Sequence, residues 1–95
     1  MIVHNLLLKL QDRSSESSAK AKDLLLTLNG NVEVIRKLKV GVDIRRAESS
    51  YDVALIAKFD TKADYQSYLV HPFHVKVGNQ LKSNIAAAAS VCFEE

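Results

Sequence analysis

Residues 68–74 read Tyr-Leu-Val-His-Pro-Phe-His and hold two of the three histidines and the only proline of the chain. Pro72 disfavours helical geometry at His71 and suits the first turn of a new helix. We therefore expect one helix to end near His71 and another to run from the proline to about residue 83. This break places a tyrosine and two histidines around the joint between two helices.

Three segments upstream of this joint alternate apolar and polar residues with a period of two, which predicts strands at about 2–10, 37–46 and 51–59. His4 shares its face of the first segment with four apolar residues, so it faces a core or a pocket. The second face of segment 51–59 is only partly polar. Burial in a dimer is one way to cover such a face.

Helices are predicted between these strands. Residues 15–29 carry an apolar stripe at helical spacing, formed by Ala21, Leu24, Leu25 and Leu28, and Asn29-Gly30-Asn31 ends it. Asp60 and Thr61 are good N-caps for the helix that carries Tyr65 and Tyr68. A last strand is expected at about 87–94. The resulting order is consistent with an α+β fold, in which a four-stranded antiparallel sheet is covered by helices on one side.

Composition favours one globular domain over residues 1–95, with 47% hydrophobic and 25% charged residues. The net charge of +2 is too small and evenly spread for a nucleic-acid surface, and the basic run 36–39 is better interpreted as the solvated face of a strand. No apolar run approaches the roughly 18 residues of a membrane span. Cys92 is the only cysteine, which suits a reducing cytosol, so we expect a cytoplasmic protein.

The joint suggests acid–base chemistry. A helical turn would place His71 and His74 on roughly one face, with Tyr68 one turn before them and His4 facing them from the sheet. Imidazoles near neutrality exchange protons, and a phenol donates to a carbonyl oxygen that gains negative charge. Enolisation, aldol-type ring closure and carbonyl addition are therefore plausible reactions. The alternative is architectural, because either joint histidine can cap a helix and His4 can bond a backbone carbonyl.

A metal site is a competing interpretation, since His4, His71 and His74 supply three nitrogen atoms. No carboxylate or thiol stands at a recognisable ligand spacing, however, and Pro72 fits a helix start better than a ligand helix. We therefore predict neither a metal nor another cofactor. Cys92 has no basic partner nearby in sequence, so we expect it to be a small packing residue and not a nucleophile.

With these features the chain resembles the stress-responsive A/B barrel family, also called Dabb domains. The resemblance covers nearly the whole chain, and its most specific element is the Tyr-x-x-His-Pro-x-His stretch together with the histidine of the first strand. It also includes Val-Gly-Val-Asp at 40–43, Tyr-Asp-Val-Ala-Leu-Ile-Ala-Lys-Phe at 51–59 and Ser-Val-Cys-Phe-Glu at 90–94. It implies a ferredoxin-like domain that pairs through its sheet into a homodimeric α/β barrel.

In the plant polyketide-cyclase branch of that family, a tyrosine and the second histidine of the element promote an aldol cyclisation. By position these are Tyr68 and His74, while His4 matches a histidine that shapes the pocket and His71 one with a more structural role. Two functions follow as hypotheses. One is a homodimer with a pocket for a small aromatic or polyketide-like ligand, which it binds and cyclises or tautomerises. The other is a non-catalytic, stress-associated dimer whose histidines serve the fold.

Overall fold

Strands and helices follow one another as the hydrophobic pattern predicts. The computed structural model describes residues 1–95. In chain order the elements are β1 (Ile2–Leu10), α1 (Ser15–Leu26), β2 (Lys37–Val42), β3 (Val53–Phe59), α2 (Lys62–Val70), α3 (Pro72–Leu81), a short 3-10 turn (Lys82–Asn84) and β4 (Ile85–Glu94). None of the helices combines the length and hydrophobicity that crossing a bilayer requires.

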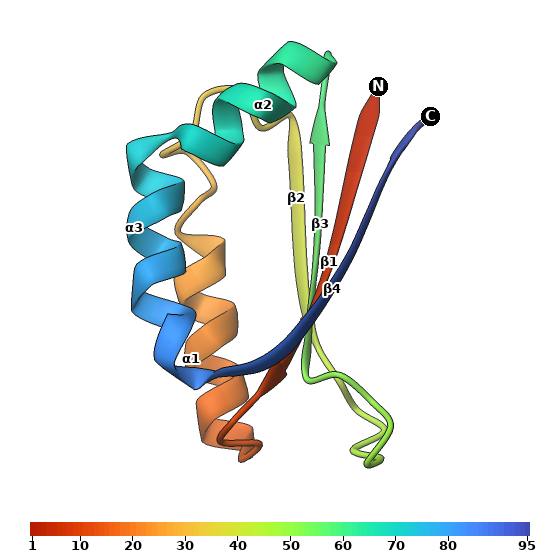
Figure 1. The fold of residues 1–95 in the computed structure, drawn as a ribbon, viewed down its shortest axis with the longest axis vertical. Coiled ribbons are helices and arrows are strands. Elements are labelled where there is room, and N and C mark those ends of the chain that lie inside the picture. Colours follow the sequence, from red (N-terminus) through yellow and green to blue (C-terminus); the bar gives the residue numbers. More distant parts are fainter.

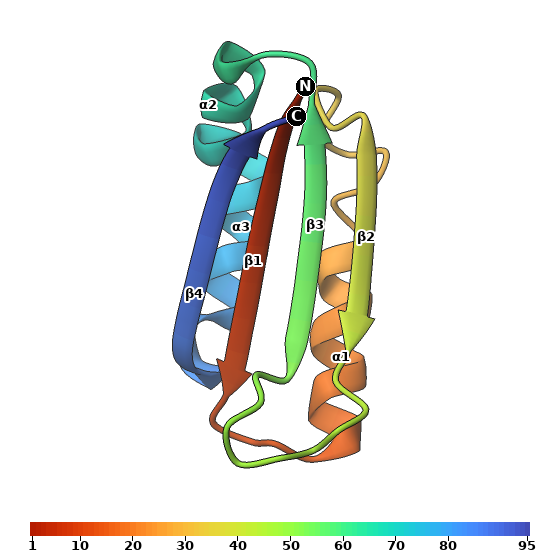
Figure 2. The ribbon, with the colours of Figure 1, turned by 90° about the vertical axis from the view of Figure 1, so that its right-hand side faces the viewer.

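The four strands form one antiparallel sheet in the order β2-β3-β1-β4. All three helices lie on the same face of this sheet (Figure 1), and the opposite face carries no helix (Figure 2). The two chain ends lie side by side at one end of the sheet, where the Glu95 amide donates to the Met1 carbonyl at 2.8 Å. This βαββαβ arrangement is the ferredoxin-like fold that the sequence predicts.

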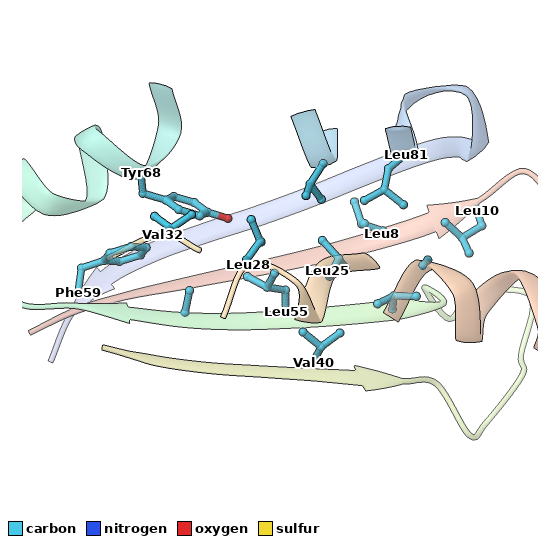
Figure 3. Packing of buried hydrophobic residues seen from close by; sticks show 14 of the residues in the cluster. Leu8, Leu10, Leu25, Leu28, Val32, Val40, Leu55, Phe59, Tyr68 and Leu81 are labelled. Atoms are coloured by element: carbon cyan, nitrogen blue, oxygen red, sulfur yellow. The ribbon is translucent and has the colours of Figure 1, made fainter. Parts of the chain in front are cut away.

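The core lies between the sheet and the helices. On β1 the even-numbered residues face the helices, and on β3 the odd-numbered ones do, as the alternation predicts. Figure 3 shows them meeting side chains of the helix layer; the labelled members are Leu8, Leu10, Leu25, Leu28, Val32, Val40, Leu55, Phe59, Tyr68 and Leu81. The sheet is therefore packed on one side by a continuous apolar layer.

Two elements end earlier than predicted. Strand β2 stops at Val42 and not near residue 46, because Val42 pairs with Val53, the first residue of β3. Beyond that pair the chain turns, and the next apolar residue of the alternation, Ile44, is 97% exposed. Helix α1 stops at Leu26 and not at residue 29, although the apolar stripe continues through a turn in which Leu28 is buried.

The loop between β2 and β3 is held by a buried carboxylate. Asp52 is 4% exposed, and its Oδ2 atom accepts a hydrogen bond from the Leu10 amide at 2.8 Å. Its Oδ1 atom lies 3.1 Å from Nε of Arg13, whose Nη2 atom donates to the Ser50 carbonyl at 2.7 Å. These contacts tie the end of β1 to the start of β3 and to the loop before it.

Strand β4 is the least covered part of the sheet. Every residue of it after Ile85 is exposed, on the helix-facing side as well as on the other. Cys92 pairs with His4 across the β1–β4 ladder and therefore shares its helix-facing side. The prediction that Cys92 is a packing residue is wrong, because the residue is exposed.

The face of the sheet without helices, called the open face below, remains partly apolar. From the register its members include Val3, Leu7, Ile56, Val91 and Phe93. Three of these large side chains stay exposed, at 41% for Leu7, 60% for Val91 and 49% for Phe93. A contiguous apolar surface of this kind is typical of a face that another protein surface covers.

Candidate functional site

The joint between α2 and α3 forms as predicted. Helix α2 ends at Val70, His71 adopts an extended conformation with φ −62° and ψ 132°, and Pro72 opens α3. The extended conformation follows from the proline ring, which disfavours helical geometry at the preceding residue. The break turns the chain at the end of α2, so that His74, in the first turn of α3, lies next to Tyr68 of α2.

His71 is the N-cap of α3. Its Nδ1 atom accepts a hydrogen bond from the Phe73 amide at 3.1 Å, so the ring proton lies on Nε2. Nε2 in turn donates to Oε2 of Glu33 at 3.1 Å. The pKa of the Glu33 carboxyl is lowered, first by its own backbone amide and then by the hydrogen bond from His71. Both nitrogens of His71 are therefore engaged in holding the start of α3.

His74 has one nitrogen fixed and one available. Its Nδ1 atom lies 3.1 Å from the Leu69 carbonyl oxygen. Because a carbonyl oxygen only accepts, Nδ1 carries the proton, and Nε2 is left with a lone pair that can accept one. Burial lowers the pKa of His74, the Leu69 carbonyl partly opposes this, and nearby His71 lowers the pKa further. The imidazole is therefore neutral at pH 7.

Tyr68 lies at the centre of the aromatic side chains, only 1% exposed. Its ring centroid is 4.3 Å from that of His74 and 5.1 Å from that of Phe59. Figure 3 shows Tyr68 reaching from α2 into the core, over Phe59 and Val32. Burial, reinforced by neighbouring Tyr65, raises the pKa of the Tyr68 phenol to about 12. The hydroxyl therefore keeps its proton and is a hydrogen-bond donor at any physiological pH.

His4 contributes a buried polar atom without a partner. The residue is 6% exposed, and its Nδ1 atom is the one buried side-chain nitrogen or oxygen in the chain that makes no hydrogen bond. Its ring lies 6.2 Å from Tyr68 and 5.2 Å from Tyr65. Burial lowers its pKa, as does His74, so His4 is neutral at pH 7. An unpaired buried nitrogen costs stability, and such exceptions in native proteins call for an explanation.

Together these residues form what we call the His4–His74 cluster, made of His4, Tyr65, Tyr68 and His74. Three of its members were predicted from the sequence as site residues. Tyr65 was predicted only as part of a helix stripe, although its position three residues before Tyr68 indicates the same face of α2. His71, predicted beside His74, instead contacts Glu33.

None of the main clefts is lined by His4, Tyr68 or His74. A cleft of about 430 Å³ lies next to the cluster, between α2 and the end of β4, and shares Tyr65 with it. We call this the α2–β4 cleft; its lining includes Ile2, Lys62, Tyr65, Leu69, Cys92 and Glu94. No group of three or more histidine, cysteine or acidic side chains is placed to hold a metal ion.

The family model of the stress-responsive A/B barrel domain matches residues 2–94. The chain belongs to this family. No curated protein matches the chain in sequence. As an A/B barrel domain the chain resembles several solved structures across nearly its whole length, and these comparisons agree with the ferredoxin-like fold described above.

One similar structure is a dimeric ferredoxin-like protein of unknown function from Bacteroides fragilis, 29% identical, with a TM-score of 0.83 over 99% of this chain and 95% of that one. A second is a dimeric ferredoxin-like protein of unknown function from Thermobifida fusca, which is 22% identical, with a TM-score of 0.84 over 99% of this chain and 90% of that one. A third is a hydroxynitrile lyase from Passiflora edulis, which is 11% identical, with a TM-score of 0.80 over 97% of this chain and 90% of that one. At the identities of the last two, the likeness shows the fold alone.

Proposed function

We propose that this A/B barrel domain is a cytoplasmic homodimer, paired through the open face, in which each protomer binds a small aromatic or polyketide-like ligand at the His4–His74 cluster. The exposed apolar side chains of the open face support the pairing, as does the dimeric state of the Bacteroides fragilis and Thermobifida fusca proteins. The single unpaired thiol supports the location.

The observation that carries the binding proposal is the unpartnered Nδ1 of His4. A buried nitrogen without a hydrogen bond is costly, and a ligand hydroxyl or carbonyl group beside Tyr65 and Tyr68 would satisfy it. The surrounding aromatic rings provide the apolar contacts that small-molecule sites combine with a few polar groups. His71 takes no part in this binding, because both of its nitrogens hold the start of α3.

The chemistry that these groups support is proton abstraction next to a carbonyl. The Tyr68 hydroxyl donates a hydrogen bond to the ligand's carbonyl oxygen, on which negative charge develops. Nε2 of His74 accepts the proton from the adjacent carbon, and the electron pair of that C–H bond forms the enolate. Attack of the enolate carbon on a second carbonyl of the same ligand breaks the π bond of that carbonyl and closes a ring, and the resulting alkoxide takes back the proton from Nε2 of His74. No metal or organic cofactor takes part in this scheme.

A non-catalytic dimer is the second candidate, and one observation favours it. Tyr68 is 1% exposed, and none of the main clefts is lined by it or by the two histidines beside it. On this hypothesis the cluster is a packed corner of the core, and His74 serves only to fix the joint through the Leu69 carbonyl.

The deciding experiment combines NMR titration of the imidazole signals with a proton-exchange assay. Acetophenone exchanges its methyl protons with D₂O through an enol, so catalysed exchange reports the proposed proton abstraction directly. We expect acetophenone to shift the signals of His4 and His74 and to exchange faster with the protein than without it. His74→Gln is expected to reduce the catalysed rate by about 100-fold or more, since general bases contribute factors of this order.

His71→Asn is the matched control, because it removes an imidazole three residues away and asparagine still caps a helix. It should exchange acetophenone protons as the unchanged protein does. Tyr68→Phe removes only the hydroxyl and is expected to slow exchange by about 100-fold while the fold is kept. Unshifted imidazole signals, together with equal rates in the presence and absence of protein, would establish the non-catalytic alternative.

A further inference from the structure

The α2–β4 cleft has the composition of a small-molecule site. Ile2, Leu69 and the ring of Tyr65 give it an apolar wall, and Cys92 lies on its strand side. Its volume of about 430 Å³ is within the range of ligand sites, roughly 300–1,000 Å³. The cleft lies between α2 and the helix-facing side of β4 near the end of that strand.

The charges at the cleft favour an uncharged occupant. Lys62 and Glu94 both line it, and neither forms an ion pair with another residue of the chain. Their opposite charges leave the cleft without a net field that would select an anion or a cation. The apolar wall is therefore the main source of affinity, with polar groups at the edge available to a hydroxyl or carbonyl group.

Tyr65 connects this cleft to the His4–His74 cluster. The same side chain lines the cleft and lies 5.2 Å from the ring of His4, whose Nδ1 atom is unpartnered. Cys92 supplies a second connection, because it faces His4 directly across the β1–β4 ladder. A ligand in the cleft thus lies one side chain away from the buried nitrogen that needs a hydrogen bond.

We propose that the α2–β4 cleft binds the apolar part of a neutral aromatic ligand. The polar end of this ligand passes beside the Tyr65 ring and reaches His4. This inference rests on the proposed function, since it states how a ligand reaches the cluster and what class of molecule fits. It makes Tyr65 and Cys92 the residues that set the size of the ligand.

The only thiol of the chain provides a direct test. 2-Naphthol, which is neutral and aromatic, is used as the probe, and the rate at which iodoacetamide alkylates Cys92 is measured with and without it. At a naphthol concentration about ten times its Kd, alkylation is expected to slow by about tenfold, because occupancy reduces the free fraction by the factor 1 + [L]/Kd. Naphthalene-2-sulfonate, the anionic analogue, should protect less; equal protection would contradict a cleft for neutral ligands.

The control shows whether naphthol slows alkylation only of a thiol in the cleft. It is the double variant Cys92→Ser and Ser49→Cys, which moves the thiol to the exposed β2–β3 loop at the opposite end of the sheet (Figure 2). Its alkylation should not respond to naphthol. A second pair of variants tests the space: Cys92→Leu fills the cleft and should weaken naphthol binding by about tenfold, whereas Ala88→Leu, which adds bulk on the same side of β4 outside the cleft lining, should bind naphthol as before.

The outcomes separate this inference from the function on which it rests. Naphthol that shifts the His4 and His74 signals without protecting Cys92, and binds Cys92→Leu normally, overturns the cleft and leaves the proposed function standing. Protection of Cys92 with no response of either histidine supports a ligand site in the cleft, but overturns both the contact with His4 and the proposed function. Protection of Cys92 in the unchanged protein, together with loss of the histidine shifts in Cys92→Leu, supports both. A thiol that naphthol never protects overturns the inference.

Discussion

His71 and His74 show how differently two histidines three residues apart can be used. His71 accepts a hydrogen bond from a backbone amide at Nδ1 and donates one from Nε2 to Glu33, so neither nitrogen is left for other chemistry. His74 donates from Nδ1 to a backbone carbonyl and keeps Nε2 as an acceptor beside Tyr68. The difference arises from Pro72, which places His71 outside α3 as its cap and His74 inside its first turn.

The lowered pKa values of His4 and His74 predict how stability depends on pH. In the unfolded chain an imidazole titrates near pH 6.5, whereas burial lowers the pKa of both histidines in the folded protein. Between the unfolded and folded values the unfolded chain binds more protons, so stability falls as the pH drops below about 6.5. Above that pH these two groups contribute no slope. Urea unfolding at a series of pH values between 5 and 8 measures the effect.

His74→Gln provides the control for this pH prediction, because glutamine does not titrate and one of the two contributions is removed. Its urea midpoint should therefore fall less steeply on acidification than that of the unchanged protein. Equal slopes in both proteins, or a stability that rises as the pH falls below 6.5, would contradict the lowered pKa of His74.

The sequence predicted the joint well because its determinants are local. Pro72 alone specifies where α2 stops and α3 starts, and the alternation of β1 places His4 on the helix side. The partner of His71 was not predictable, because Glu33 lies in an irregular segment with no periodic pattern. The exposure of Cys92 was missed for a related reason: strand patterning gives the side that a residue faces but not how closely the helices pack against it.

At the scale of elements, the end of β2 was misplaced because strand pairing decides where a strand stops. The alternation of residues 37–46 continues past Val42, but a strand is stable only where its neighbour pairs with it, and β3 begins opposite Val42. The loop that follows is organised by contacts distant in sequence, above all those of Asp52 with Leu10 and Arg13. No periodic pattern encodes such contacts.

Asp52 is therefore predicted to stabilise the junction of β1, β3 and the loop between β2 and β3. Asp52→Ala leaves the buried Leu10 amide without its acceptor and Arg13 without its carboxylate, which should cost about 2–3 kcal/mol of unfolding free energy. Asp52→Asn keeps an acceptor oxygen and should cost less. Glu48→Gln, a change at an exposed loop position whose carboxylate makes no ion pair, is the control. Urea unfolding at pH 7 compares the three; a loss no larger in Asp52→Ala than in Glu48→Gln would contradict the prediction.

At the scale of the whole molecule, all the helices cover one face of the sheet and the other face carries none. A chain of 95 residues has a small core, so an apolar open face is a substantial share of the surface that can still be buried. The partly polar second face of β3 indicated this from the sequence, whereas the contribution of Val91 and Phe93 needed the register of β4 with β1. Pairing of two open faces would bury these side chains and place each α2–β4 cleft on its own protomer.

This pairing predicts that charge on the open face separates the protomers. Leu7→Lys combined with Val91→Lys puts two cations at exposed positions of that face, where a paired sheet would have to bury them unpaired. Analytical ultracentrifugation should find the unchanged protein dimeric and this variant monomeric. Ile44→Lys is the matched control, since it replaces a large apolar residue that is 97% exposed but lies in the loop after β2. It should remain dimeric at the same concentration. A double variant that sediments as the dimer would place the interface elsewhere, whereas a monomeric unchanged protein would show that the open face is covered by something other than a second copy.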